Sequence, residues 1–324
     1  MTRVVLSLFM MLAPTISALA ATDDSEWPKR VIRFIVPSTP GSSADTMARV
    51  VAQKLGERLG QQLVVDNRPA AAGTIAAEGL ARSAPDGYTI GVVTTSTQVI
   101  ARIFNENLSY DPLKDFSPIA TVGASPYVLA VYPGLPVTSV AELIALAKSK
   151  PRQLNNAAFG TTSLGHLAGV LFAHQAGIEL NPVAYRSSAQ AVFDAVAGRI
   201  EMQFSTLPPA LPLIREGKLR GLATTGGKRV SLLPDVPTLA ECGLTGYDVA
   251  LWMGLAAPAN TPPAIVARLN KELTAILATP EVNDALLQQG MVAEPGAASE
   301  LGDRIARDLN KWRDVVAKVG IKVQ

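Results

Sequence analysis

Short β-branched segments alternate with amphipathic helical segments along almost the whole chain, and this alternation limits the fold more than any other feature. Strands separated by helices pair mostly in parallel, because the helical crossover returns the chain to the same end of the sheet. The sequence therefore predicts an α/β fold of parallel or mixed sheets flanked by helices. The expected strands are Val31–Val36, Leu63–Asp66, Thr89–Thr94, Ile119–Val122, Tyr127–Val131, Leu154–Ala158, Val183–Tyr185, Ile200–Phe204 and Leu219–Thr224.

Capping residues mark where helices should begin and end. The apolar face of Ala44–Leu59 predicts a helix that starts behind Ser42 or Ser43 and stops at Gly60. The segment Ala256–Pro263 is expected to be a loop on composition. Further helix signals are the capping-box spacings Ser139–Glu142 and Thr238–Glu241, the pair Thr261-Pro262, and the amphipathic stretch Ser299–Val319.

The first twenty residues have the pattern of a secretory signal peptide. Arg3 precedes an apolar run over Val4–Ala13, and Ala18-Leu19-Ala20 offers a small-residue cleavage site. The apolar run is too short to cross a membrane. We therefore expect residues 1–20 to be removed and the mature protein to be periplasmic.

Composition excludes several classes of protein. Apolar residues make up 48% of the chain and charged residues 17%, which is typical of a well-packed globular protein. The net charge of +2 argues against nucleic acid or an acidic membrane surface as the main partner. With only two histidines and one cysteine, Cys242, no metal site and no cofactor are expected.

The length suggests two lobes, since the mature chain of about 300 residues exceeds the usual size of a single core. No long linker separates two halves, so the backbone is expected to cross between lobes more than once. Loop-like breaks at Gly123–Pro126 and Gly246–Asp248 are the expected crossings. The predicted organisation is a signal peptide over 1–20, lobe 1 over 21–123 and 250–324, and lobe 2 over 124–249.

The loop Pro37–Asp45 is the first candidate binding site. It follows a strand and precedes a helix, and ligands of open α/β sheets bind where strands end and helices begin. Free backbone N–H groups and the helix dipole favour a carboxylate or phosphate there. The alternative is a merely structural turn and cap.

Three other loops have the same design. Phe159–Ser163 follows a strand and precedes the helix that carries His166, and Thr94–Thr97 follows another strand. Arg186–Ser188 leads into the helix that contains Asp194. Two such loops from opposite lobes would clamp a small anion between them.

Catalysis is poorly supported. Neither a phosphate-binding Walker loop nor a dinucleotide fingerprint occurs, and Thr161–Gly165 only approaches the G-x-S-x-G nucleophile elbow. His166 lies three residues after Ser163 on the same helix, where it is badly placed to act as the base. A capping or packing role for His166 and an inert thiol at Cys242 are the simpler interpretations.

An ordered series of motifs resembles the periplasmic substrate-binding proteins of tripartite tricarboxylate transporters, also called the Bug family, over essentially the whole mature chain. These motifs are Trp27-Pro28, VPSTPGSSADTMAR (36–49), DNRPAAAGTIAAE (66–78), PDGYT (85–89), YDPLKDFSPIA (110–120), FGTTSLGHLAG (159–169), VAYRSSAQAVFDAVAGRI (183–200), LPDVPTLAECGLTGY (233–247) and LWMGLAAPANTPPAIVARLN (251–270).

The resemblance implies a two-lobed periplasmic binding protein of type II, with a mixed sheet in each lobe and a cleft that closes on a small carboxylate. It implies that backbone amides, hydroxyls and bridging waters hold the carboxylate. By motif, the ligand-binding residues would be Gly41, Ser42, Ser43, Asp45, Thr95 and Ser96 in lobe 1, and Thr161, Thr162, Ser163, Tyr185 and Asp194 in lobe 2. This chain departs from the family pattern by having Ser42, Ala70, Ala72 and Ser187 in place of glycines.

The expected function is therefore non-enzymatic capture of a di- or tricarboxylate, an amino acid or an aromatic acid, by a monomer that delivers its ligand to membrane transporter subunits. A periplasmic sensor that signals to a histidine-kinase receptor is the alternative within the binding class. A secreted hydrolase or lyase that works through Ser163 or Asp194 is the alternative from another class.

Overall fold

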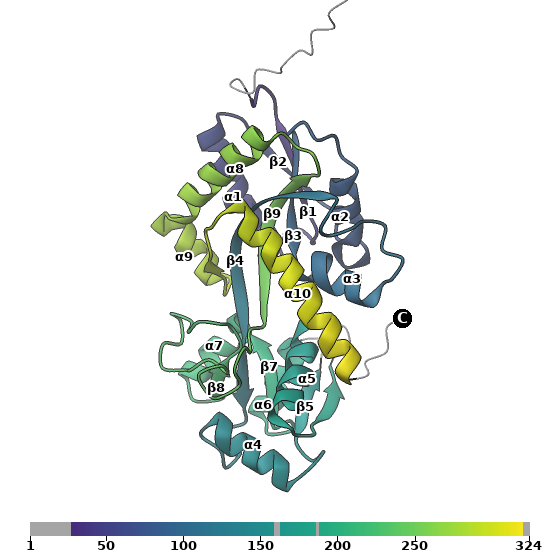
Figure 1. Cartoon of the computed structure of the whole chain (residues 1–324). Helices are drawn as coiled ribbons and strands as arrows, with labels where there is room; N and C mark the ends of the chain where they lie inside the picture. Colours follow the sequence, from purple (N-terminus) through teal and green to yellow (C-terminus); the bar gives the residue numbers. More distant parts are fainter. Residues whose placement is uncertain (1–26, 159–162, 186–187, 320–324) are drawn as a thin grey trace, which may run out of the picture.

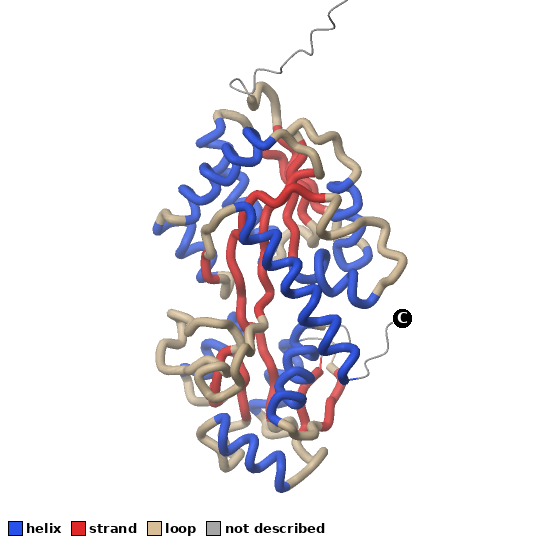
Figure 2. The backbone as a smooth tube through the Cα atoms, viewed as in Figure 1, coloured by secondary structure: helices blue, strands red, loops and turns tan. Residues whose placement is uncertain are grey.

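The α/β fold expected from the sequence is confirmed by a computed structural model, which describes residues 27–158, 163–185 and 188–319. The molecule is elongated, with an upper and a lower half stacked end to end and a sheet that runs through both (Figures 1 and 2). The strand order is β2-β1-β3-β9-β4-β7-β5-β6, with β8 and β10 also paired to β4.

The upper half begins with three parallel strands, in which β1 lies between β2 and β3. Helix α1 packs Met47, Val51 and Leu55 into the apolar core of this half. The elements are β1 (Ile32–Val36), α1 (Ser43–Leu59), β2 (Leu63–Asn67), the 3₁₀ turn η2 (Ala71–Gly73), α2 (Thr74–Ala81), β3 (Thr89–Thr94), the π-helical segment η3 (Ser96–Ile100) and α3 (Ala101–Phe104).

The lower half repeats the parallel arrangement, with β5 between β6 and β7. Helix α5 packs Leu167 and Phe172 into a cluster that also contains Phe204 of β7. The elements are α4 (Val140–Ser149), β5 (Asn155–Ala158), α5 (Leu164–Ala176), β6 (Asn181–Ala184), α6 (Ser188–Val196), β7 (Met202–Thr206), α7 (Leu207–Arg215) and β8 (Arg220–Thr224).

Two antiparallel strands join the halves, β4 (Phe116–Val131) and β9 (Ala250–Pro258). Up to Pro126, β4 pairs with β9, and from Tyr127 onward it pairs with β7 and β8. We call this level, around residues 125–127 and 249–251, the waist. The chain passes between the two halves at this level.

The prediction of a loop at Gly123–Pro126 is wrong, because β4 is one continuous strand. Register shifts at Pro118/Ala120 and Thr121/Gly123 let the strand absorb Pro118 and Gly123 as bulges, and Pro126 pairs in regular register with Ala250. The loop predicted from Ala256 onward is also wrong over Ala256–Pro258, which form the buried end of β9. Pairing with β4 and β3 on both sides overrides the loop-like composition there.

The last third of the chain returns to the upper half and then spans both. Its elements are α8 (Pro263–Leu277), α9 (Pro280–Gln288), β10 (Val292–Ala293) and α10 (Ala298–Val319). Helix α10, yellow in Figure 1, runs diagonally from the upper half to the lower half. It contacts β4, α8 and η3, and also α5 of the lower half. Trp312 shares an apolar cluster with Leu164 and Leu167 of α5.

The caps confirm some helix boundaries and correct others. Ser42 caps α1 by accepting a 3.2 Å hydrogen bond from the Asp45 amide, and Gly60 ends the helix with φ 70°. Helix α8 starts at Pro263, one residue later than predicted, because Thr261 Oγ1 donates to the Pro258 carbonyl at 2.8 Å instead of capping. Thr238 and Glu241 form the predicted reciprocal hydrogen bonds, at 2.7 and 3.1 Å, but these close a turn and not a helix.

Candidate ligand-binding site

The carboxyl ends of the parallel strands in both halves point toward the waist. In the upper half, Thr94 at the end of β3 pairs with Met253, near the point where β9 leaves the waist, and β1 and β2 run parallel to β3. In the lower half, Thr206 at the end of β7 pairs with Tyr127, and β5 and β6 run parallel to β7. The carboxyl ends of these six strands therefore face each other across the waist, and ligands of α/β sheets bind at such strand ends.

Asp45 organises the first of these loops. Its carboxylate is only 2% exposed, and its Oδ2 accepts hydrogen bonds from the Gly41 amide at 2.8 Å and from Arg49 Nε at 2.9 Å. Its Oδ1 accepts from Asn67 Nδ2 at 2.8 Å, and the same Nδ2 donates to the Ser38 carbonyl at 3.0 Å. The loop is thus fastened to α1 and to the end of β2.

The charge of Asp45 is satisfied within the loop. Burial alone would raise the pKa of this carboxyl, but the hydrogen bonds from Arg49, Gly41 and Asn67 outweigh it and lower the pKa below its usual value. Both carboxylate oxygens and the Gly41 N–H are used inside the protein. These two predicted site residues therefore shape the loop through internal contacts.

Thr95 and Ser96, which follow β3, differ in exposure. Thr95 is 1% exposed, and its Oγ1 accepts a 3.0 Å hydrogen bond from the Trp252 amide and donates to the Ala250 carbonyl at 3.3 Å. This side chain ties the end of β3 to β9 at the waist. Ser96, in contrast, begins η3 with an exposed side chain.

Two lower-half contributors are held by their neighbours. Ser163 caps α5, because its Oγ accepts a 3.2 Å hydrogen bond from the His166 amide. Tyr185 Oη donates to Asp194 Oδ2 at 2.9 Å, and Arg199 Nη1 pairs with Asp194 Oδ1 at 3.0 Å. Burial and the hydrogen bond to Asp194 raise the pKa of Tyr185.

The structure thus brings Tyr185 and Asp194 together, as it does Gly41, Ser42 and Asp45. Thr161 and Thr162 lie outside the described residues, and Ser43 is described only as the first residue of α1. Sequence reasoning missed Asn67 and Arg49, which fix the first loop through Asp45. Asn67 was detectable as a polar residue at the carboxyl end of a strand, whereas the role of Arg49 depends on the burial of its partner.

Two other reactive side chains, His166 and Cys242, are partly buried. His166 is half-buried, and this burial lowers its pKa, which favours the neutral ring. Burial raises the pKa of the Cys242 thiol, which makes it less reactive. Within the described ranges, no group of three or more His, Cys, Asp or Glu side chains is placed to hold a metal ion.

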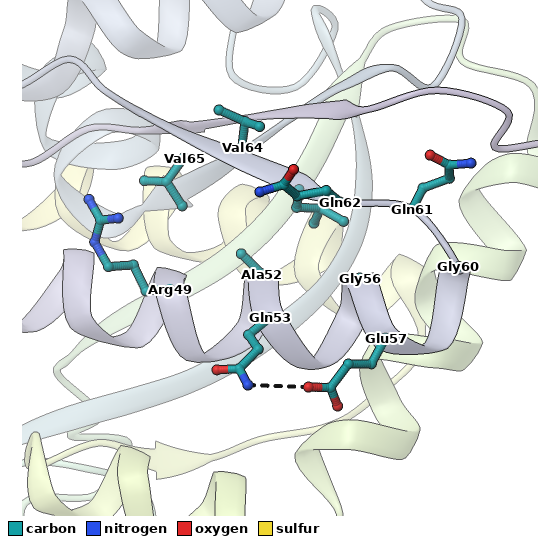
Figure 3. Close-up of a pocket in the computed structure, with 11 residues that line it drawn as sticks. Arg49, Ala52, Gln53, Gly56, Glu57, Gly60, Gln61, Gln62, Val64 and Val65 are labelled. Carbon is teal, nitrogen blue, oxygen red and sulfur yellow. Dashed lines mark hydrogen bonds between the residues drawn. The ribbon is translucent and has the colours of Figure 1, made fainter.

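Two open grooves of about 670 Å³ each lie away from the predicted site residues. One lies between α1 and the edge strand β2, where Gln53 Nε2 donates to Glu57 Oε1 at 3.2 Å (Figure 3). All the residues that line this groove belong to α1, β2 or the turn between them, in the upper half. The other lies at the waist between residues 226–230 and α10, and charged side chains of both signs line it, among them the ion pair of Arg304 with Glu294.

Among the residues that the structure describes, no helix combines the length and apolar character needed to cross a membrane.

Comparison with known proteins identifies relatives over nearly the whole chain. The uncharacterised protein of the tcbD–tcbE intergenic region of Pseudomonas sp. strain P51 is 35% identical over 95% of this chain and 91% of its own length. Protein BugT of Bordetella pertussis is 33% identical over 100% of this chain and 99% of its own.

Solved structures agree with this relationship. Rpa4515 of R. palustris, determined with adipate, is 35% identical with a TM-score of 0.74, over 91% of this chain and 99% of its own. MatC of Rhodopseudomonas palustris, with bound malate, is 30% identical with a TM-score of 0.70, over 90% of this chain and all of its own (100%). A TctC solute-binding protein from Polaromonas, without ligand, gives a TM-score of 0.82 at 28% identity, over 90% of this chain and 99% of its own.

Other similar structures are those of a periplasmic transporter and of the periplasmic binding protein BugD, and the predicted two-lobed binding-protein fold is confirmed. The sequence profile of the tripartite tricarboxylate transporter family receptor matches residues 47–321. The chain belongs to the tripartite tricarboxylate transporter family of solute-binding receptors.

Proposed function

We propose that this protein captures a small carboxylate at the waist, by closure of its two lobes, and delivers it to a membrane transporter. The observation that carries the proposal is the convergence of six strand ends, three from each half, at one level of the molecule. Amides and hydroxyls at such loops suit a carboxylate, and adipate and malate accompany two of the similar structures.

The proposal includes the lobes and the site expected from the sequence. Lobe 1 comprises 21–123 and 250–324, and lobe 2 comprises 124–249; the strand exchange at the waist supports this division. Within the proposed site, exposed Ser96 and the Thr161–Ser163 loop contact the ligand, while Asp45 and Thr95 position their loops. The mature protein acts as a periplasmic monomer after removal of residues 1–20, without a cofactor and without catalysis.

Calorimetric titration of the purified mature protein with malate, adipate and other dicarboxylates tests the proposal. A ligand at about a hundred times its dissociation constant should add roughly 2.7 kcal/mol to the free energy of unfolding, which also appears as a thermal shift. Binding of any of these acids without turnover supports the proposal. The absence of both heat and thermal shift across the panel would contradict it.

A pair of matched variants tests the location of the site. Ser96→Trp places a large side chain on the exposed position at the waist and should abolish binding. Ser149→Trp changes an exposed serine on α4 in the lower half, and should leave the affinity unchanged. Equal affinities of the two variants would place the site elsewhere.

A further inference from the structure

The turn that follows β2 has an unusual backbone. Ala71 and Ala72 have φ values of 51° and 53°, and Gly73 follows with φ 88°, so three consecutive residues lie in the left-handed region. A Cβ atom makes this region unfavourable, and alanine lacks the side-chain oxygen that lets asparagine or aspartate tolerate it. The other described non-glycine residues with positive φ, Arg152 and Asn260, occur singly.

Packing places this turn between the two upper loops of the proposed site. A Cβ atom built on Gly73 would lie 2.7 Å from Pro37 Cβ, in the loop after β1, and 3.1 Å from Thr97 Cγ2, after β3. The turn is therefore pressed against both neighbouring strand-end loops. The side chains of Ala71 and Ala72, in contrast, are exposed.

The hydrogen bonds of the turn are formed within the segment 70–74 itself. The Gly73 amide donates to the Ala70 carbonyl at 3.0 Å, and Thr74 Oγ1 donates to the Ala71 carbonyl at 2.9 Å. The amides of Ala71 and Ala72 have no acceptor among the residues that the structure describes. Strained backbone of this kind persists where surrounding contacts impose it, and it is concentrated at ligand-binding sites.

We infer that the left-handed turn Ala71–Gly73 is a third upper wall of the binding site, and that the methyl groups of Ala71 and Ala72 limit the length of the carboxylate that fits. This inference rests on the proposed function. The wall consists of two small side chains and the free amides behind them. Removal of either methyl enlarges the site without removing a donor, because glycine keeps the same backbone N–H.

The test compares Ala71→Gly and Ala72→Gly with Asn260→Gly. Asn260 has φ 65°, is exposed, and follows β9 at the end of the sheet away from the waist. All three substitutions relieve a left-handed residue, so all three should preserve the fold. Each variant is titrated with malate, adipate and a longer unbranched dicarboxylate.

We expect Ala71→Gly or Ala72→Gly to shift the ratio of affinities toward the longer acid by about tenfold, the lower end of the effect of one methylene in a binding pocket. Asn260→Gly should leave the ratio unchanged. Unchanged ratios in both alanine variants, with binding intact, would overturn the inference but leave the proposed function standing. A wild-type protein that binds none of the acids would overturn both.

Discussion

The indole Nε1 of Trp252 donates a 2.8 Å hydrogen bond to Oδ2 of Asp308, which joins β9 to α10 at the waist. Asp308 Oδ1 also pairs with Lys311 Nζ at 2.9 Å, and that ammonium group donates to the Asp248 carbonyl at 2.8 Å. One carboxylate thus connects the helix that spans both halves to the segment by which the chain returns from the lower half.

Asp308→Ala should lower the free energy of unfolding by about 2 kcal/mol, because a buried N–H without an acceptor costs roughly 1–3 kcal/mol. Trp252 is 1% exposed, so its indole N–H depends on this carboxylate for an acceptor. Urea unfolding followed by tryptophan fluorescence measures the change. Asp303→Ala, an exposed position on the same helix, is the control and should change stability by less than about 0.5 kcal/mol. Equal effects at the two positions would contradict this role of Asp308.

Asp45→Asn should make the protein less stable at neutral pH, and the difference from wild type should depend on pH. The folded pKa of Asp45 lies below its ordinary value of 3.8, so its stabilising contribution is present above that value and is lost as the pH falls through the folded pKa. The stability difference should therefore be constant near neutrality and shrink below about pH 4. Urea unfolding over a pH series measures it, with exposed Asp235→Asn as the control. A difference that persists unchanged into strong acid would refute the assignment.

Thr95→Val keeps the shape of the side chain but removes the hydroxyl that accepts from the Trp252 amide. Because that amide lies in the buried waist, we expect a loss of about 1–2 kcal/mol in the free energy of unfolding. Thr95→Ser retains the oxygen and should recover most of the loss. If the serine variant is destabilised and the valine variant is not, packing of the methyl group and not the hydrogen bond is what matters at this position.

Cys242 should react slowly with a thiol reagent in the folded protein. Burial raises the pKa of its thiol, with a smaller contribution from the charge of Glu241, so less of the reactive thiolate is present. Modification by a chromogenic disulfide at mildly alkaline pH should be several-fold slower than in the same chain unfolded in urea. Equal rates would show that the thiol is freely accessible.

Local patterns in the sequence predicted the parts of the fold that depend on local chemistry. Ser42 and Gly60 delimit α1 because a hydroxyl cap and a left-handed glycine act within one helical turn. The strand boundaries near β1 and β3 followed from β-branched runs bounded by polar loops. The two lobes followed from length and from the absence of a linker.

The parts that failed depend on contacts between distant segments. Pro118, Gly123 and Pro126 have the composition of a loop, yet pairing with β9 along their whole length keeps them in one strand. Thr238–Glu241 forms its capping box without a helix, and backbone hydrogen bonds pair the segment with Thr224 instead: the Leu239 amide donates to the Thr224 carbonyl, and the Thr224 amide donates to the Pro237 carbonyl.

At the candidate site, too, local features could be predicted and features that depend on distant contacts could not. The loops could be identified because each follows a predicted strand. The sequence did not show that both carboxylate oxygens of Asp45 accept hydrogen bonds within the protein, because these bonds depend on the position of Asn67 and on the burial of Asp45. Nor did it show that Ala71 and Ala72 adopt left-handed backbone beside Gly73, which packs closely against Pro37 and Thr97. These features arise only when loops from three strands meet.

The register of the two strands at the waist has a consequence for the engineering of the molecule. Ser125 of β4 and Leu251 of β9 are direct partners in an antiparallel pair. Everything between them, which is the lower half apart from the end of α10, is therefore topologically the loop of a β-hairpin. An entire lobe occupies a place that a two-residue turn fills elsewhere, so lobes from related proteins should be exchangeable at this one pair of positions.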